Sequence, residues 1–138
     1  MAAKYVFDRE DVHSCMLEAC KEFYKNPDHD QVIENATEAL LDFVREKSEH
    51  THLSEVDELL DTVFHKEKPV LAFSAKKQGH DKEVQEAMLL MMKGVLKSGM
   101  TKNNRKFFLD DHDKALNYLA MINSIANHIE KAKKMELE

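Results

Sequence analysis

The chain has 138 residues, of which 43% are hydrophobic and 33% are charged, and its net charge is -6 with histidine neutral. This composition excludes a disordered chain, which would hold fewer apolar residues, and it fits one helical domain over residues 1–138. The longest apolar run, 87–92, is far shorter than the ~20 residues of a membrane-spanning helix, and the first residues lack the apolar stretch of a secretion signal. We therefore expect a cytoplasmic protein without a membrane contact.

Three helices are predicted in the first half of the chain. The first begins at Asp8, and its apolar residues recur at steps of three and four up to Asn26-Pro27, which ends it. The second begins at Asp28, which with Gln31 forms a capping box. The third begins at Ser54, whose hydroxyl is expected to cap a helix with a narrow apolar stripe.

Further helices are predicted in the second half. A short helical segment is expected over 69–77, because Pro69 suits a first helical turn. A longer helix follows from about Asp81 to Ser98, then a loop over 98–106, and the last helix starts in the Asp-rich stretch 110–113. With only three Gly and two Pro in the chain, these elements predict an all-α fold. Its expected form is an antiparallel bundle of four main helices plus one short helix.

The helix over 81–98 has more apolar surface than one neighbouring helix can cover. Its apolar arc spans roughly 220°, against the ~100° or more typical of a surface helix. One face holds Val84, Ala87, Met88, Met91 and Val95. The arc is extended by Met92 and by a second stripe formed by Leu89, Leu96 and Met100. Either this helix is central to the bundle, or the second stripe faces a partner, which includes a second copy of the chain.

Charge is distributed unevenly along the sequence. Residues 28–67 hold twelve Asp or Glu and three Lys or Arg, a net charge of -9, whereas residues 68–106 hold nine Lys or Arg and three Asp or Glu, a net charge of +6. Such asymmetry favours charged partners, because a patch of one sign attracts the opposite sign. The acidic contact surface predicted from it comprises Asp42, Glu46, Glu49, Asp57, Glu58 and Asp61.

Two pairs of residues carry a spacing known from helical ribonucleases. Arg45 and His50 are separated by four residues, and Arg105 and His112 by six. The spacing resembles the R-x(4-6)-H pattern of the HEPN-type ribonucleases, and the second pair falls near the start of the last helix, where that family places its motif. The resemblance implies that His112 would move a proton and Arg105 would stabilise phosphate charge. It covers only these positions, and Lys106 and Phe107 depart from the family pattern.

Metal binding is a second possibility for the histidines. Glu10 with His13 and Glu49 with His52 match the E-x-x-H spacing of di-iron helical bundles, but no further inward carboxylates are predicted. A surface metal ion at His50 and His52 is the form that this alternative takes. No cofactor is predicted, because the three glycines cannot form a phosphate-binding loop.

Nucleic acid is not the predicted partner, since the chain is acidic overall and has no zinc finger, basic zipper or RNP-like strand. Cys15 and Cys20 lie five positions apart on a predicted helix, which suits free thiols better than a disulfide. The sequence therefore predicts a non-enzymatic adaptor, inhibitor or regulator that binds another protein. The alternative is a small helical enzyme, either HEPN-like or metal-dependent.

Overall fold

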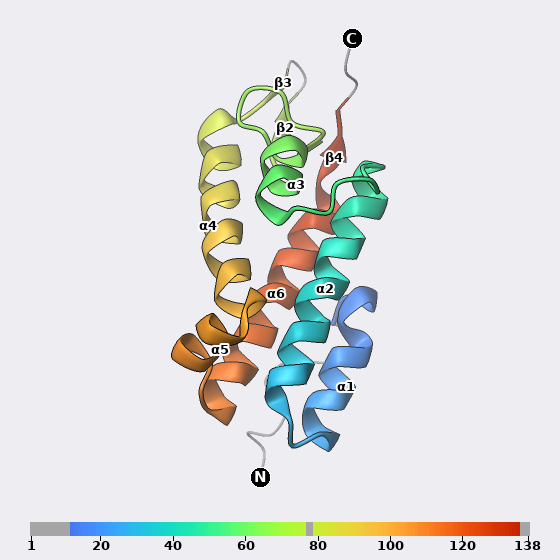
Figure 1. The fold of residues 1–138 in the computed structure, drawn as a ribbon. Helices are drawn as coiled ribbons and strands as arrows, with labels where there is room; N and C mark the ends of the chain where they lie inside the picture. The colour runs from blue at the N-terminus through green and yellow to red at the C-terminus, as the bar shows by residue number, and fades with distance from the viewer. Residues whose placement is uncertain (1–11, 77–78, 136–138) are drawn as a thin grey trace.

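The computed structural model describes residues 12–76 and 79–135, and within them it contains six α-helices and one 3-10 helix (Figure 1). The helices are η3 (Ser14–Met16), α1 (Leu17–Lys25), α2 (His29–Ser48), α3 (Val56–Val63), α4 (Lys82–Met100), α5 (Lys102–Phe108) and α6 (His112–Lys131). Four strands of two residues each form two antiparallel pairs: β1 (Leu71–Ala72) with β4 (Lys133–Lys134), and β2 (Ala75–Lys76) with β3 (Gly79–His80). The predicted helical class is confirmed. None of the helices in these ranges has the length and apolar character needed to cross a membrane.

Side-chain caps fix where the helices begin. The Asp28 carboxylate accepts the Gln31 N–H, and the Asp111 carboxylate accepts the Lys114 N–H, as expected for N-cap residues. The cap predicted at Ser54 is wrong by one position, because the Glu55 carboxylate accepts the first free N–H groups of α3. The predicted cap Asp8 lies outside the described residues.

The long helices are not all antiparallel to their neighbours. In Figure 1, α2 and α6 both run upward, whereas α1 and α4 run downward. Because α2 and α6 pack directly against each other, the central pair of the fold is parallel. The uniformly antiparallel bundle of four main helices expected from the sequence is therefore not confirmed.

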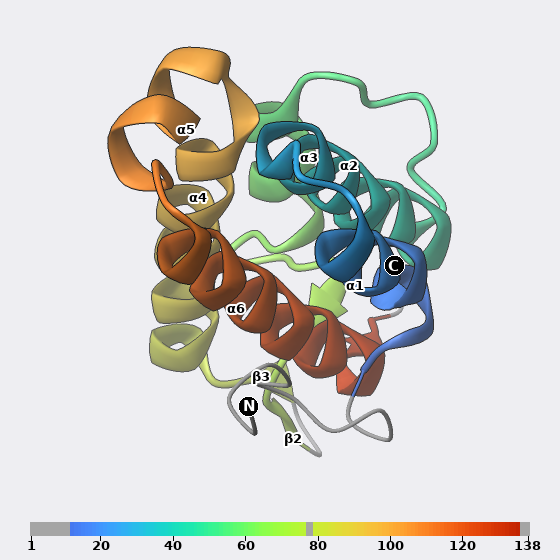
Figure 2. The same cartoon turned by 90° about the horizontal axis from the view of Figure 1, so that it is seen from below.

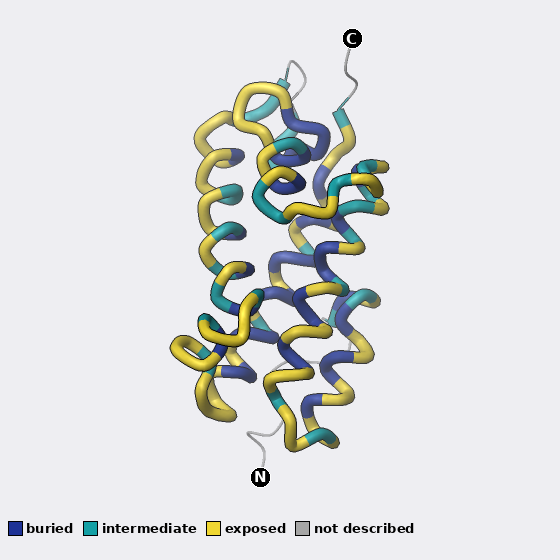
Figure 3. The backbone as a smooth tube through the Cα atoms, viewed as in Figure 1, coloured by how far each residue is buried: buried dark blue, intermediate teal, exposed yellow. Residues whose placement is uncertain are grey.

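The core lies between α2 and α6, and α4 covers only one edge of it (Figure 3). Four residues of α4 are buried, namely Gln85, Met92, Leu96 and Gly99, compared with nine of α6. Of the two alternatives left open for this methionine-rich helix, the central position is therefore not the one observed. Figure 2 shows α4 at the side of the molecule opposite α1.

The short helix predicted over 69–77 is not found in the described part of this range, 69–76, which instead contains β1 and β2. The buried side chain of Gln85 explains the difference. Its Oε1 accepts the Phe73 N–H at 3.1 Å, and its Nε2 donates to the Leu71 carbonyl at 2.9 Å. Since these bonds satisfy backbone groups that would otherwise need helical partners, the extended form is stable inside the protein.

The loop predicted over 98–106 is wrong as well, because α4 continues to Met100 and α5 follows after one residue. Thr101 makes this possible, since its hydroxyl accepts the Asn104 N–H and caps α5. At the end of α4, Gly99 lies against the buried Tyr118, whose hydroxyl is 2.8 Å from the Thr37 hydroxyl. Burial raises the pKa of Tyr118 to about 12, although the Thr37 hydrogen bond and the charge of Arg105 oppose this shift.

Candidate functional site

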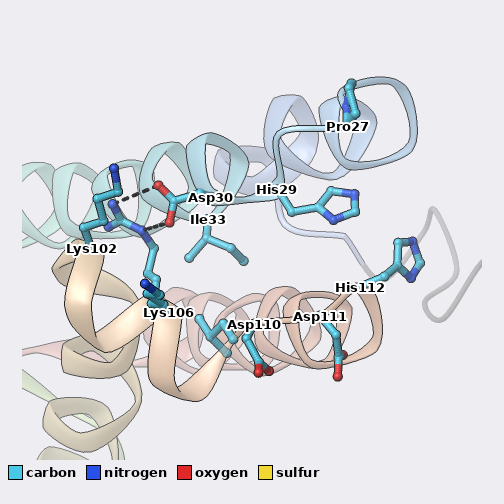
Figure 4. Close-up of a pocket in the computed structure, with 11 residues that line it drawn as sticks. Pro27, His29, Asp30, Ile33, Lys102, Lys106, Asp110, Asp111 and His112 are labelled. Atoms are coloured by element: carbon cyan, nitrogen blue, oxygen red, sulfur yellow. Dashed lines mark hydrogen bonds and ion pairs between the residues drawn. The ribbon is translucent and has the colours of Figure 1, made fainter.

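The residues of the ribonuclease-like motif line one cavity of about 530 Å³. It lies where the first turns of α2 and α6 meet α5, and both Arg105 and His112 are part of its wall. Figure 4 shows Asp30 and Lys102 at one end of the cavity, and His29 with His112 at the other. Arg105 and His112 therefore line the same cavity. His112 lies at the end of the cavity opposite Asp30, which is the residue that binds Arg105.

The Arg105 guanidinium is engaged in the fold. Its Nε donates to Asp30 Oδ1 at 2.6 Å and its Nη2 donates to Asp30 Oδ2 at 3.2 Å. Its Nη1 donates to the carbonyls of Gly99 at 3.0 Å and Met100 at 3.2 Å. The pKa of Arg105 is raised, chiefly by the hydrogen bond to Asp30. This buried side chain therefore joins α2 to the end of α4, and its donors are directed at protein oxygens.

The far end of the cavity holds a cluster of rings that the sequence analysis missed in part. The imidazoles of His29 and His112 have centroids 5.1 Å apart, and both contact the Phe23 ring, at 4.6 Å and 4.8 Å. Burial lowers the pKa of His29, the charge of His112 lowers it further, and Asp28 opposes the shift. Burial and the charge of His112 both favour the neutral form of the His29 imidazole. The sequence signal for this cluster is the tripeptide Asp-His-Asp, which occurs at the start of α2 (28–30) and again at the start of α6 (111–113).

The metal prediction at His50 and His52 has little geometric support. Their ring centroids are 5.8 Å apart, and His50 Nδ1 is bonded to the Ser48 carbonyl at 2.8 Å. Across 12–76 and 79–135, no three His, Cys, Asp or Glu side chains are grouped so that they could hold a metal ion. Glu10, one half of an E-x-x-H pair, lies outside these ranges, and Glu49 pairs with Lys134.

The cysteines are free, as predicted, and neither has the properties of a nucleophile. Burial raises the pKa of both Cys15 and Cys20 to about 11. At neutral pH both therefore hold their protons, whereas a reactive cysteine needs the thiolate form.

Most of the predicted acidic surface is occupied by internal ion pairs. Asp42 pairs with Arg45 at 2.9 Å, and Glu49 pairs with Lys134. Asp57 and Asp61 pair with lysines of α4, and Glu46 and Glu58 are exposed on α2 and α3. Four of the six predicted acidic side chains thus have a cationic partner within the chain.

Ion pairs between the acidic and the basic stretch of the sequence connect α3 to α4. Asp57 Oδ2 lies 3.0 Å from Lys97 Nζ, and Asp61 Oδ1 lies 2.5 Å from Lys93 Nζ. Both pairs connect a residue of the acidic stretch 28–67 to one of the basic stretch 68–106. The same holds for Asp30 with Arg105 and for Glu67 with Lys82. Opposite charges in neighbouring stretches of sequence thus meet within the fold.

The excess apolar arc of α4 is real, but the exposed stripe is the other one. Leu96, predicted to face a partner, is buried, and Leu89 and Met100 are partly buried against the fold. The stripe left at the surface contains Val84, Ala87 and Met91, with Met91 43% exposed. The spacing of the apolar residues gives the width of the arc. It does not show which side of the helix packs against α6 and which side faces solvent.

The exposed stripe continues into a hollow of about 280 Å³ beside α6. Val95, Phe108 and Met121 line this hollow, and the last two are 52% and 49% exposed. We call the combined area the Met91 surface, and it comprises Val84, Ala87, Met91, Gly94 and Val95 of α4, Phe108 of α5 and Met121 of α6. The sequence analysis missed Phe108 and Met121, because one fell next to a predicted loop and the other lies outside the apolar stripe of its helix.

A family model described as "Protein of unknown function (Hypoth_ymh)" matches residues 10–129. The chain belongs to this Hypoth_ymh family. No curated protein and no solved structure matches it. The part of the chain matched to Hypoth_ymh contains every residue of the cavity and of the Met91 surface. Both features thus fall within the Hypoth_ymh region.

Proposed function

We propose that this protein is a non-enzymatic interaction module of the cytoplasm, acting as an adaptor, inhibitor or regulator that binds a protein through the Met91 surface. The observation that carries the proposal is that large apolar side chains from three helices are exposed in one region: Phe108 and Met121 line one hollow with Val95, and Met91 lies one helical turn before Val95 on α4. Met91, Phe108 and Met121 are each about half exposed. Single exposed apolar residues are ordinary, whereas contiguous ones typically mark a contact with another molecule.

The chemistry of the surface suits binding to a protein. Methionine is unbranched and polarisable, so Met91 and Met121 can adapt to differently shaped apolar groups. Phe108 supplies a rigid aromatic side chain, which is the type of residue that often dominates binding energy at an interface. The hollow between Val95 and Met121 offers a recess for a partner's side chain. The acidic residues first predicted for this role are not part of the proposal, because four of the six are held in internal pairs.

Affinity purification from the native host tests the proposal. Met91→Asp and Met121→Asp place a carboxylate in the surface, and both should reduce recovery of a specifically bound protein at least tenfold. Leu17→Asp is the matched control, because Leu17 is 40% exposed on α1, on the other side of the molecule from α4 (Figure 2). Recovery that is equal for all three variants and the unchanged protein would refute the proposal.

A second candidate function is RNA cleavage, and one observation favours it. Arg105 and His112 line the same cavity, and the second imidazole, His29, lies beside His112. A pair of imidazoles can act as general base and general acid in phosphodiester cleavage. Purified protein would then cleave single-stranded RNA, and His112→Ala and His29→Ala would each abolish the cleavage. Absence of cleavage by the unchanged protein would remove this candidate.

A further inference from the structure

We propose that the partner on the Met91 surface is a second copy of this chain, with two α4 helices packed antiparallel across a two-fold axis that passes midway between Met91 and Gly94. This inference rests on the proposed function and names the molecule that fills the surface. In such a dimer each copy uses the same patch, so the patch must complement itself in charge and in shape.

Charge is the first argument for a second copy. Each chain carries a net charge of -6, so two copies repel each other unless their contact area is free of charge. None of the seven residues of the Met91 surface is ionisable. Lys93 and Lys97 of α4 are directed to Asp61 and Asp57 of α3, and Lys114, which lines the adjoining hollow, pairs with Asp110. The apolar stripe of α4 therefore offers no charged group to a partner of opposite charge, whereas a second copy meets an equally neutral stripe.

Shape is the second argument. The stripe alternates small and large side chains, with Ala87 and Gly94 on either side of Met91. A Cβ atom built at Gly94 meets no heavy atom of the described residues within 4 Å, so these residues leave the space above Gly94 open. Helices approach each other most closely where side chains are small. When two stripes face each other in opposite directions, Met91 of one copy fits over Gly94 of the other.

The open space at Gly94 permits a sharp experiment. Because a Cβ atom at position 94 meets no heavy atom of residues 12–76 and 79–135 within 4 Å, Gly94→Arg should leave the fold intact while it places a long cation in the middle of the contact. Asn35→Arg is the matched control, since it adds the same charge at an exposed position of α2. Sedimentation velocity of the full chain at ~1 to 100 µM should show a dimer for the unchanged protein and for Asn35→Arg. Gly94→Arg should weaken the dimer at least 100-fold, with unchanged circular dichroism.

Three results would overturn the inference. The first is an unchanged protein that stays monomeric at 100 µM, and the second is a Gly94→Arg variant that dimerises as tightly as the control. The third is a Gly94→Cys variant that a thiol-to-amine cross-linking reagent joins to Lys4, within residues 1–11 of its own chain, which would make that segment the occupant. A monomer that still captures a host protein in a Met91-dependent manner would leave the proposed function standing and refute only the dimer. A monomer without such capture would refute both.

Discussion

Asp30 in the first turn of α2 and Arg105 on α5 form a bidentate ion pair, although 75 positions separate them in the sequence. The same guanidinium bonds the last carbonyls of α4, so one side chain closes the junction of three helices. This relationship changes how the ribonuclease-like spacing is interpreted. An arginine that stabilises phosphate charge must present its donors to the substrate, and the Arg105 donors are presented to the protein.

Arg105→Lys should therefore reduce stability before it reduces any activity. Lysine keeps the positive charge but lacks the planar fork that binds Asp30 and the two carbonyls together. We expect a loss of about 1 to 3 kcal/mol in the free energy of unfolding, measured by urea titration. Lys106→Ala, at the next and exposed position, should change it by less than about 0.5 kcal/mol. Equal stability of Arg105→Lys and the unchanged protein would show that the pair has no structural role.

Two glycines of α4 should respond in opposite ways to the same substitution. A Cβ at Gly99 would lie 2.2 Å from the Tyr118 hydroxyl, in a fully packed site, so Gly99→Ala should destabilise the protein by about 1 to 3 kcal/mol. A Cβ at Gly94 meets nothing, so Gly94→Ala should stabilise the helix by about 0.5 to 1 kcal/mol. Thermal unfolding at low protein concentration, where association is small, measures both changes. Two changes of the same sign would contradict this description of α4.

The ion pairs between α3 and α4 should be coupled in a double-mutant cycle. Lys93→Asp places two carboxylates opposite each other, and Asp61→Lys does the same with two ammonium groups. Each single change should reduce stability by up to about 1 kcal/mol, and the reversed pair should recover part of the loss. The coupling should shrink at high salt. A cycle in which the two effects simply add would mean that the charges do not interact.

His29 should make stability depend on pH in the weakly acidic range. Its pKa in the folded protein lies below the ordinary value of 6.5, mainly because burial disfavours the charged ring. The unfolded chain therefore binds the proton first as pH falls, which favours unfolding. The contribution is complete above pH 6.5 and is lost as pH falls from 6.5 towards the folded pKa. His29→Gln should lose less stability between pH 7 and pH 5 than the unchanged protein. A larger loss would reverse the sign of the shift.

The sequence predicts the helical class well because helix signals are local. Apolar spacing and N-caps such as Asp28 and Asp111 depend on residues within one or two turns. The extended segment at β1 could not be predicted in this way. Its backbone is satisfied by Gln85, more than ten positions later, and a buried glutamine inside a helix carries no sequence signal of that role.

The sequence predicted that α4 carries an additional apolar surface, but it did not predict which side chains form that surface. The width of the apolar arc on α4 could be read from the sequence, whereas its orientation depends on where α6 and α3 pack. Charge segregation was also visible, yet the positions of Lys93 and Lys97 opposite α3 could not be known before the fold. The same limit applies to His29, which gains its neighbour His112 only when α2 and α6 come together.

Photo-cross-linking in the native host tests the central claim most directly. A photoreactive amino acid at position 91 samples the Met91 surface, and one at position 38, an exposed site on α2, samples an unrelated face. We predict adducts to a protein, either a second copy or another chain, from position 91 and none from position 38. A chain that forms no adduct at position 91, or equal adducts at both positions, would contradict a binding role for this surface.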